Sequence, residues 1–269
     1  MKENKLLRGL CVLTAALMLG LTGCANGSDT NGSDTQSQAA TAEVQSAWTE
    51  LDQTTITKEM GMGWNLGNQL EASNAGIPSE TTWGNPTISE DLIKAVKEQG
   101  FKTVRIPVSY LDKIGAAPDY TIDSAWLDRV QEVVDYVVGN DLYAIINIHG
   151  DGYYTVDKSW LRCVDDNQDE IKDKYEKVWA QIADRFKDYD QHLIFESMNE
   201  EFDNTYGKPN ATGYENINAY NQIFVDTVRK TGSNNEKRWL LIPGWNTNIE
   251  YTAGNYGFVI PTDIVASFL

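Results

Sequence analysis

Short apolar runs that end in polar residues alternate with helical patterns along this chain, and this alternation is the strongest constraint on its fold. Each strand, loop and helix together take roughly 40 to 50 residues, with no internal sequence repeat and no hairpin signal between them. The predicted strands are residues 61–68, 103–108, 143–149, 193–198, 238–243 and 263–268. Strands buried on both faces give continuous apolar runs, so the pattern predicts a parallel sheet covered by helices.

Two architectures fit a parallel sheet of this kind: an open doubly wound sheet and an eight-fold barrel. An open sheet could be complete with five or six strands, but Gly67-Asn68-Gln69 lacks the glycine spacing of a dinucleotide-binding turn. Polar residues at the ends of the first four predicted strands fit a barrel rim better. We therefore predict an α/β fold, a (β/α)8 TIM barrel truncated after about five and a half units, because eight such units need roughly 320 residues and the chain has 269.

Helix boundaries are predicted from capping residues. Thr87 and Glu90 have the spacing of a capping box, and Gly100 follows the apolar face of that helix. The clearest periodicity begins at Asp123 and ends at Gly139.

The amino terminus has the layout of a secretory signal. Residues 1–23 combine basic residues with an apolar run too short to span a bilayer. The run ends in Leu-Thr-Gly followed by Cys24, which resembles a bacterial lipobox; the alternative is an ordinary signal with a chance cysteine. We expect residues 24–50 to be a flexible tether and residues 51–269 to be a partial catalytic domain. The expected location is extracellular, on a bacterial cell surface, with membrane attachment only through lipid at Cys24.

Charge and cysteine content restrict the partners. A net charge of −17 repels nucleic acid and anionic lipid but suits a neutral polysaccharide. Of three cysteines, Cys11 leaves with the signal and Cys24 would carry lipid, so Cys163 is expected to be a lone structural thiol. With two histidines in the chain, we predict no metal and no cofactor, and we expect a monomer.

The fourth predicted strand delivers an amide and a carboxylate, Asn199 and Glu200, to its carboxyl end. Arg105 lies inside the second predicted strand, and a buried charge needs a partner of opposite sign. Glu196 lies four residues before Glu200 on the same strand face and is the expected partner of Arg105.

Five segments resemble glycoside hydrolase family 5, the cellulase A family, in the order of that family. They are GWNLGN at 63–68, WGNP at 83–86, VRIPV at 104–108, INIH at 146–149 and IFESMNE at 194–200. The segments look most like bacterial endo-β-1,4-glucanases of the subgroup that also contains xyloglucan and mixed-linkage glucan hydrolases. The resemblance covers about residues 54–269 and implies a β-glucan substrate.

The resemblance also implies residue roles. Retaining cleavage uses two carboxyls about 5–5.5 Å apart, one of which protonates the leaving oxygen. Glu200 matches the acid/base, Asn199 the residue that binds the sugar 2-hydroxyl, Arg105 the arginine that orients the nucleophile, and His149 a histidine of the catalytic subsite. The nucleophilic glutamate belongs to a seventh strand that this chain lacks, so we expect this chain to be inactive by itself.

Five further residues near the predicted strand ends are expected to bind substrate. Four of them are aromatic, and aromatic rings stack on the C–H faces of sugars. The five residues are Asn68, Trp83, Tyr110, Tyr153 and Trp245.

Two positions depart from the family pattern. Glu201 stands where proline is usual, and Gly150 where a second histidine is frequent. We expect altered subsite contacts at both. Two other functions stay open: a non-catalytic glycan-binding surface lipoprotein and, with less support, an open-sheet nucleotide enzyme. The choice among cellulose, xyloglucan, lichenan and mannan is not determined by the sequence.

Overall fold

The computed structural model describes residues 48–264. The predicted signal, Cys24, all but the last residues of the predicted tether, and residues 265–269 of the predicted sixth strand lie outside the described residues. Asp263 and Ile264 are described and belong to no strand, so the prediction of a strand that begins at 263 is wrong at these two residues.

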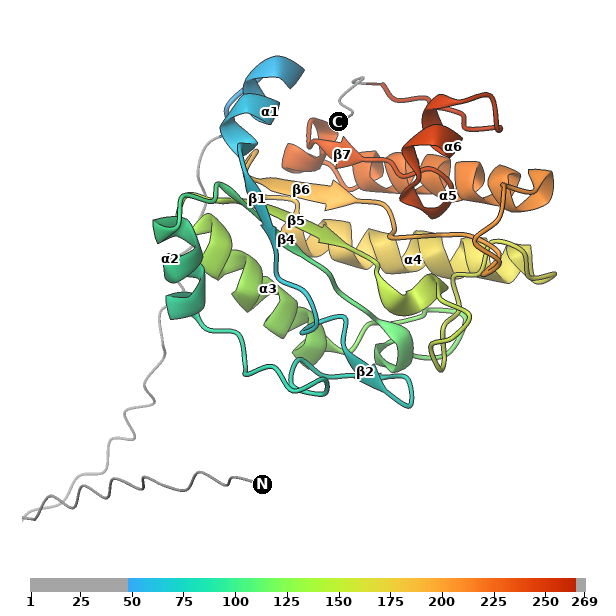
Figure 1. Ribbon diagram of the computed structural model, residues 1–269, viewed down its shortest axis with the longest axis horizontal. Coiled ribbons are helices and arrows are strands. Elements are labelled where there is room, and N and C mark those ends of the chain that lie inside the picture. Colours follow the sequence, from blue (N-terminus) through green and yellow to red (C-terminus); the bar gives the residue numbers. More distant parts are fainter. Residues whose placement is uncertain (1–47, 265–269) are drawn as a thin grey trace, which may run out of the picture. The chain divides into compact units, whose positions relative to one another are not determined.

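Five parallel strands lie side by side in the main sheet (Figure 1). They are β1 Gly63–Asn65, β4 Thr103–Ile106, β5 Tyr143–Asn147, β6 Leu193–Glu196 and β7 Leu240–Leu241. Their order in space, β1-β4-β5-β6-β7, is their order in the sequence. A doubly wound sheet reverses its direction of growth at a switch point. The order without reversal is that of a barrel wall and argues against the open-sheet alternative.

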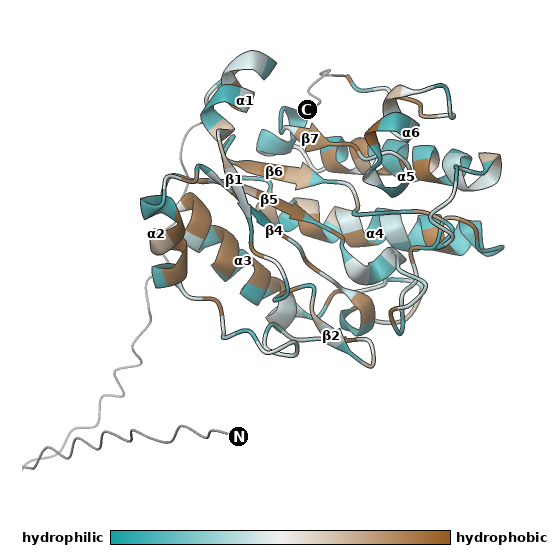
Figure 2. Cartoon of the chain, in the orientation of Figure 1, coloured by the Kyte–Doolittle hydropathy of each residue, from teal (hydrophilic) through white to brown (hydrophobic). Residues whose placement is uncertain are grey.

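A helix follows each of the first four strands and lies on the outer side of the sheet (Figure 1). These helices are α2 Glu90–Glu98, α3 Ser124–Val138, α4 Gln168–Phe186 and α5 Ala211–Lys230. Figure 2 shows a hydrophobic stripe along α3 and hydrophobic residues along β5 and β6. Between α4 and α5, the rings of Trp179 and Phe224 pack edge to face, with their ring centroids 4.5 Å apart. The core therefore lies between the helices and the outer face of the sheet.

A short helix that the sequence did not predict, α1 Gln53–Met60, packs against the amino ends of the strands. Its Ile56 is buried with Tyr143 and Ile194 on the inner side of the wall. The hydroxyl of Tyr143 donates to Glu59 at 2.7 Å. The helix escaped prediction because Ile56 is its one buried residue, too little to give a periodic pattern.

Several strand boundaries differ from the predicted ones. β1 is three residues long, and beyond it the chain turns at Asn68, which has a φ of 66°. β7 contains only the two residues that pair with β6. A small antiparallel hairpin, β2 Ser73–Asn74 with β3 Ile77–Pro78, was not predicted. Pro107 directly follows the last residue of β4, as expected for a residue that removes a ladder donor.

The two predicted helix starts have different outcomes. α2 is capped by Ser89, whose Oγ accepts from the backbone N–H of Leu92 at 3.3 Å, so the capping box at Thr87 is wrong. Asp123 caps α3 by accepting from the backbone N–H of Trp126 at 3.1 Å, which confirms that prediction.

Candidate functional site

The predicted polar residues lie at the carboxyl ends of β4, β5 and β6. Backbone hydrogen bonds tie these ends together beyond the strands. The N–H of His149 donates to the carbonyl of Val108 at 2.8 Å, and the N–H of Asn199 donates to that of Ile148 at 3.0 Å. The side chains that follow the strands therefore share one rigid frame.

Arg105 and Glu196 form a bidentate ion pair inside the barrel wall. The Nε of Arg105 lies 2.6 Å from one carboxylate oxygen of Glu196, and an Nη lies 2.8 Å from the other. Arg105 also donates to Asn65 at 3.0 Å and to Asn199 at 2.8 Å. Burial lowers the pKa of Arg105, but the hydrogen bonds and charge of Glu196 outweigh it and leave the pKa raised. The expected partnership of Arg105 with Glu196 is confirmed.

Tyr153 connects Asn199 to Glu200. The Nδ2 of Asn199 lies 2.8 Å from the tyrosine oxygen, and this hydroxyl lies 2.6 Å from Oε2 of Glu200. Burial and the neighbouring Glu200 carboxylate raise the pKa of Tyr153, so the phenol is neutral at physiological pH. The sequence predicted Tyr153 as a sugar-binding aromatic and did not reveal this polar role.

His149 is a partly buried, neutral imidazole. Asn147 accepts from the backbone N–H of Val108 through its Oδ1 at 3.3 Å, so its Nδ2 faces Nδ1 of His149 at 3.2 Å. This contact makes Nδ1 the acceptor and places the proton on Nε2. Burial, with the charge of Arg105, lowers the pKa of His149 to about 3.

The partly buried His149 should make the protein lose stability in acid. Its folded pKa of about 3 lies below the reference of 6.5, so between these values the unfolded chain binds a proton that the folded chain does not. From pH 6.5 to 4.5, the free energy of unfolding should fall roughly 2–3 kcal/mol more for the wild type than for His149→Gln. Urea unfolding at a series of pH values measures this difference.

His192 provides the matched control. Its hydrogen bond to Asp190 raises its pKa, so its contribution is fully present below the unfolded pKa and is lost only as the pH rises through the folded value. His192→Gln should therefore keep the wild-type slope between pH 6.5 and 4.5. Identical slopes for wild type and His149→Gln would contradict a lowered pKa of His149 in the folded protein.

Two of the predicted substrate-binding residues lie at the open rim. Trp83 is 52% exposed, and its Nε1 donates to the carbonyl of Ser73 at 3.0 Å, which fixes the ring with one part open to solvent. Asn68 follows β1, and its carbonyl accepts from Nδ2 of Asn85 at 2.8 Å. Both positions stay predictions for substrate contact.

The prediction that Tyr110 and Trp245 bind substrate is wrong. Both side chains are fully buried, and neither offers a ring face to a ligand. Tyr110 packs in the main core, and Trp245 packs on Tyr214 with ring centroids 6.1 Å apart. An aromatic residue just after a strand can turn into the core as readily as toward the rim, and the sequence does not separate the two cases.

The two departures from the family pattern are also buried. The Glu201 carboxyl is 1% exposed, and burial raises its pKa well above the usual range, with the charge of Asp151 as a further cause. At Gly150, an added Cβ would lie 2.5 Å from Oγ of Ser109, so a histidine there would require that serine side chain to move. Burial of both positions argues against direct contact between their side chains and a sugar, and the expectation of altered subsite contacts stays a prediction.

Asp151 is a residue whose importance the sequence did not reveal. Its buried carboxylate accepts from the backbone N–H groups of Tyr110 and Leu111 at 3.0 and 2.7 Å, and from Nε1 of Trp160 at 2.7 Å. It therefore ties the turn after β5 to the loop after β4. The one available signal was its place between two glycines, which is typical of a tight turn.

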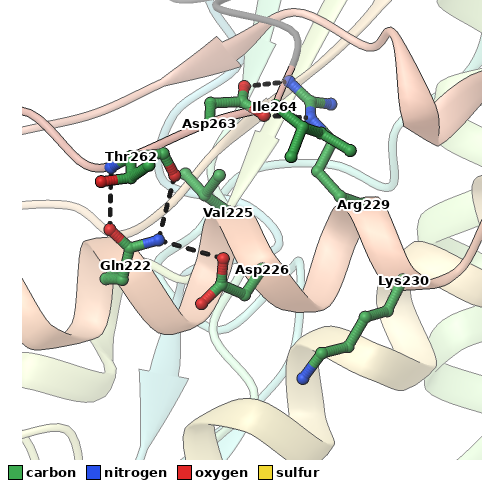
Figure 3. Close-up of a pocket in the computed structure, with 8 residues that line it drawn as sticks. All are labelled: Gln222, Val225, Asp226, Arg229, Lys230, Thr262, Asp263 and Ile264. Carbon is green, nitrogen blue, oxygen red and sulfur yellow. Dashed lines mark hydrogen bonds and ion pairs between the residues drawn. The ribbon is translucent and has the colours of Figure 1, made fainter.

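A cavity of about 520 Å³ lies elsewhere, between α5 and the segment that ends the described chain. Figure 3 shows Arg229 paired with Asp263 and Gln222 bonded to Thr262 at its wall. The lining includes none of the predicted site residues, so this cavity is separate from the candidate site.

Residues 48–264 contain neither a membrane-spanning helix nor a cluster of metal-ligand side chains. No helix there combines the length and apolar character needed to cross a bilayer. Within the same residues, no group of three or more histidine, cysteine, aspartate or glutamate side chains is placed to hold a metal ion.

Residues 67–268 of this chain match the family model described as Cellulase (glycosyl hydrolase family 5). Endoglucanase A of Paenibacillus barcinonensis is 64% identical over 208 residues, which are 77% of this chain and 52% of that protein. A family 5 xyloglucanase from Paenibacillus pabuli, solved in complex with ligand, superposes with a TM-score of 0.78 at 64% identity, over 79% of this chain and 59% of that one.

A broad-specificity endoglucanase from Ruminococcus champanellensis with bound cellotriose gives a TM-score of 0.75 at 42% identity, over 82% of this chain and 65% of that one. The chain thus spans about half the length of Endoglucanase A. The family match extends over most of the chain, and the parallel wall of the described residues is that of the barrel its structural neighbours share. The chain belongs to glycoside hydrolase family 5, the cellulase A family.

Proposed function

We propose that this protein acts in β-1,4-glucan degradation as a retaining endo-glycoside hydrolase, with Glu200 as the general acid/base. The observation that carries the proposal is the chain of hydrogen bonds from Arg105 through Asn199 and Tyr153 to Glu200. It lies at the carboxyl ends of parallel strands, where barrel enzymes perform their chemistry. In a retaining reaction the acid/base protonates the leaving oxygen and later deprotonates water.

The relatives support a β-1,4-linked glucan backbone as the substrate. One is a family 5 xyloglucanase, and another is a broad-specificity endoglucanase solved with cellotriose. The excess of acidic residues suits an uncharged polysaccharide. Xyloglucan and carboxymethylcellulose are therefore the first substrates to test.

The other carboxyl groups around this network are either held by hydrogen-bond donors or buried. Glu196 pairs with Arg105, Asp151 binds loop N–H groups, and Glu201 is buried. A retaining reaction needs a second carboxylate about 5–5.5 Å from the acid/base. We propose that this nucleophile comes from outside residues 48–264, so that those residues alone do not complete the reaction.

The same observation favours a second candidate, a protein that binds β-glucan without cleaving it. Two proteins separate the candidates: the 269-residue chain, and a barrel fusion, in which the chain through residue 268 is joined to the part of Endoglucanase A that follows the matched segment. We expect the 269-residue chain to bind cellotetraose without turnover and the barrel fusion to release reducing ends from xyloglucan or carboxymethylcellulose. Binding without turnover by both would favour the second candidate.

Trp83 should contribute to glucan affinity in either case. Its half-exposed ring can stack on the C–H face of a pyranose, and its anchored indole nitrogen limits the entropy lost on binding. Trp83→Ala should weaken cellotetraose binding by roughly tenfold, measured by titration calorimetry. Tyr136→Ala removes a partly exposed aromatic ring from the outer helix α3 and should leave the Kd unchanged. Equal affinity for wild type and Trp83→Ala would remove Trp83 from the binding surface.

A further inference from the structure

The hydroxyl of Tyr153 has a defined hydrogen-bond direction. The Oδ1 of Asn199 accepts from Arg105, so the amide is oriented with Nδ2 toward Tyr153. An amide nitrogen only donates, and a carboxyl oxygen that carries no proton only accepts, whether or not the other oxygen of the group is protonated. The tyrosine oxygen therefore accepts from Asn199, and its proton points at Oε2 of Glu200.

The position of Tyr153 is fixed by the turn that precedes it in the sequence. It directly follows the turn Gly150–Gly152, which the buried Asp151 carboxylate fixes through three hydrogen bonds. On the other side, Gly152 is pressed against Glu201: an added Cβ would lie 1.8 Å from the Oε1 of Glu201. The Glu201 side chain therefore limits movement of the turn toward the loop after β6. This restraint keeps the Tyr153 hydroxyl within hydrogen-bonding distance of Glu200 before substrate binds.

We propose that Tyr153 is a positioning residue for the acid/base, which holds Oε2 of Glu200 and leaves Oε1 to carry the proton to the leaving oxygen. The inference rests on the proposed function of Glu200. In the first step the proton moves from Oε1 to the glycosidic oxygen, which keeps the electron pair of its breaking bond to the anomeric carbon, while the nucleophilic carboxylate proposed to come from outside residues 48–264 bonds to that carbon. The carboxylate formed on Glu200 then receives the hydrogen bond from Tyr153, which Asn199 and Arg105 polarise in turn.

This role makes a prediction that depends on the leaving group. The hydrogen bond stabilises the charge that appears on Glu200 as it gives up its proton. A glucan needs that proton because its alkoxide is a poor leaving group, whereas a dinitrophenolate leaves without it. If Tyr153 only stacked on a sugar, its ring would matter and its hydroxyl would not.

A proton spectrum of the 269-residue chain gives the first test and needs no turnover. A hydroxyl that donates to a carboxylate over 2.6 Å should give a resonance far downfield. It should be lost in Tyr153→Phe and move upfield in Glu200→Gln. Tyr154→Phe removes another tyrosine–carboxylate hydrogen bond of the same loop, to Asp165, and should leave the resonance in place. Absence of a resonance that depends on both Tyr153 and Glu200 would overturn the proposal.

Kinetics of the barrel fusion give the second test. Tyr153→Phe should lower kcat on xyloglucan by about 10- to 100-fold with KM nearly unchanged, the effect of losing one hydrogen bond to a charged group. Hydrolysis of dinitrophenyl cellobioside should stay within about twofold of the wild type in its first, bond-breaking step. A raised KM with equal losses on both substrates would mean a stacking role. If Glu200→Gln abolishes turnover while Tyr153→Phe is unaffected, this inference fails alone; if Glu200→Gln keeps turnover, the proposed function itself fails.

Discussion

Glu200→Gln should lower the rate at which the barrel fusion cleaves xyloglucan by about 10²–10⁴-fold, the usual contribution of a general acid/base. Glutamine keeps the size and the contact with Tyr153 but carries no transferable proton. The loss should fall on kcat, because the carboxyl acts on the reacting bond and the rest of the cleft still binds the chain. Reducing-end release under saturating substrate measures it.

Glu215→Gln is the matched control for this substitution. Glu215 lies exposed on the outer helix α5, so the same chemical change there should leave kcat within about twofold. Similar losses for both variants would point to a general effect of removing negative charge, and wild-type turnover by Glu200→Gln would end the assignment of Glu200.

Arg105→Met should destabilise the protein by about 3–5 kcal/mol, because it leaves the buried Glu196 carboxylate without its partner. Glu196 accepts two hydrogen bonds from Arg105 and is 7% exposed. The same substitution releases Asn199, so cellotetraose binding should weaken as well. Urea unfolding of the 269-residue chain measures the change in the free energy of unfolding.

Two comparisons isolate the ion pair. Arg185→Met breaks the exposed pair of Arg185 with Asp128 and should cost less than about 1 kcal/mol. The double variant Arg105→Met, Glu196→Leu removes both charges and should recover most of the stability lost in Arg105→Met. If the double variant is as unstable as the single one, the cost comes from packing and not from an unpaired carboxylate.

The sequence predicted those parts of the fold that depend on long patterns. The apolar stripe of α3 exists because one face of that helix is buried along its length, and the continuous apolar runs of β5 and β6 exist because every residue of these strands is buried. The two-residue β7 is different, since its length depends on how much of β6 is available for pairing. Ser89 and Thr87 are both good capping residues, and only the position at which the chain enters α2 separates them.

In the candidate site, too, some contacts were predictable from the sequence and others were not. Arg105 and Glu196 were predictable as a pair because a charge within a buried strand requires a counter-charge. The hydroxyl of Tyr153 was not predictable, because its partner Glu200 is 47 positions away and the contact depends on how the turn after β5 is folded. Tyr110 and Trp83 are both aromatic residues in loops, yet one is buried and the other half exposed.

The role of Glu200 as the acid/base is tested most directly by azide rescue. Turnover of dinitrophenyl cellobioside by the Glu200→Ala form of the barrel fusion is measured with and without azide. Without its acid/base the enzyme still forms the glycosyl intermediate, because this leaving group needs no proton, but water then attacks slowly. Azide needs no general base, so it should raise turnover severalfold and give β-cellobiosyl azide, the product of net retention. Turnover that azide does not change, with no azide product, would contradict Glu200 as the acid/base.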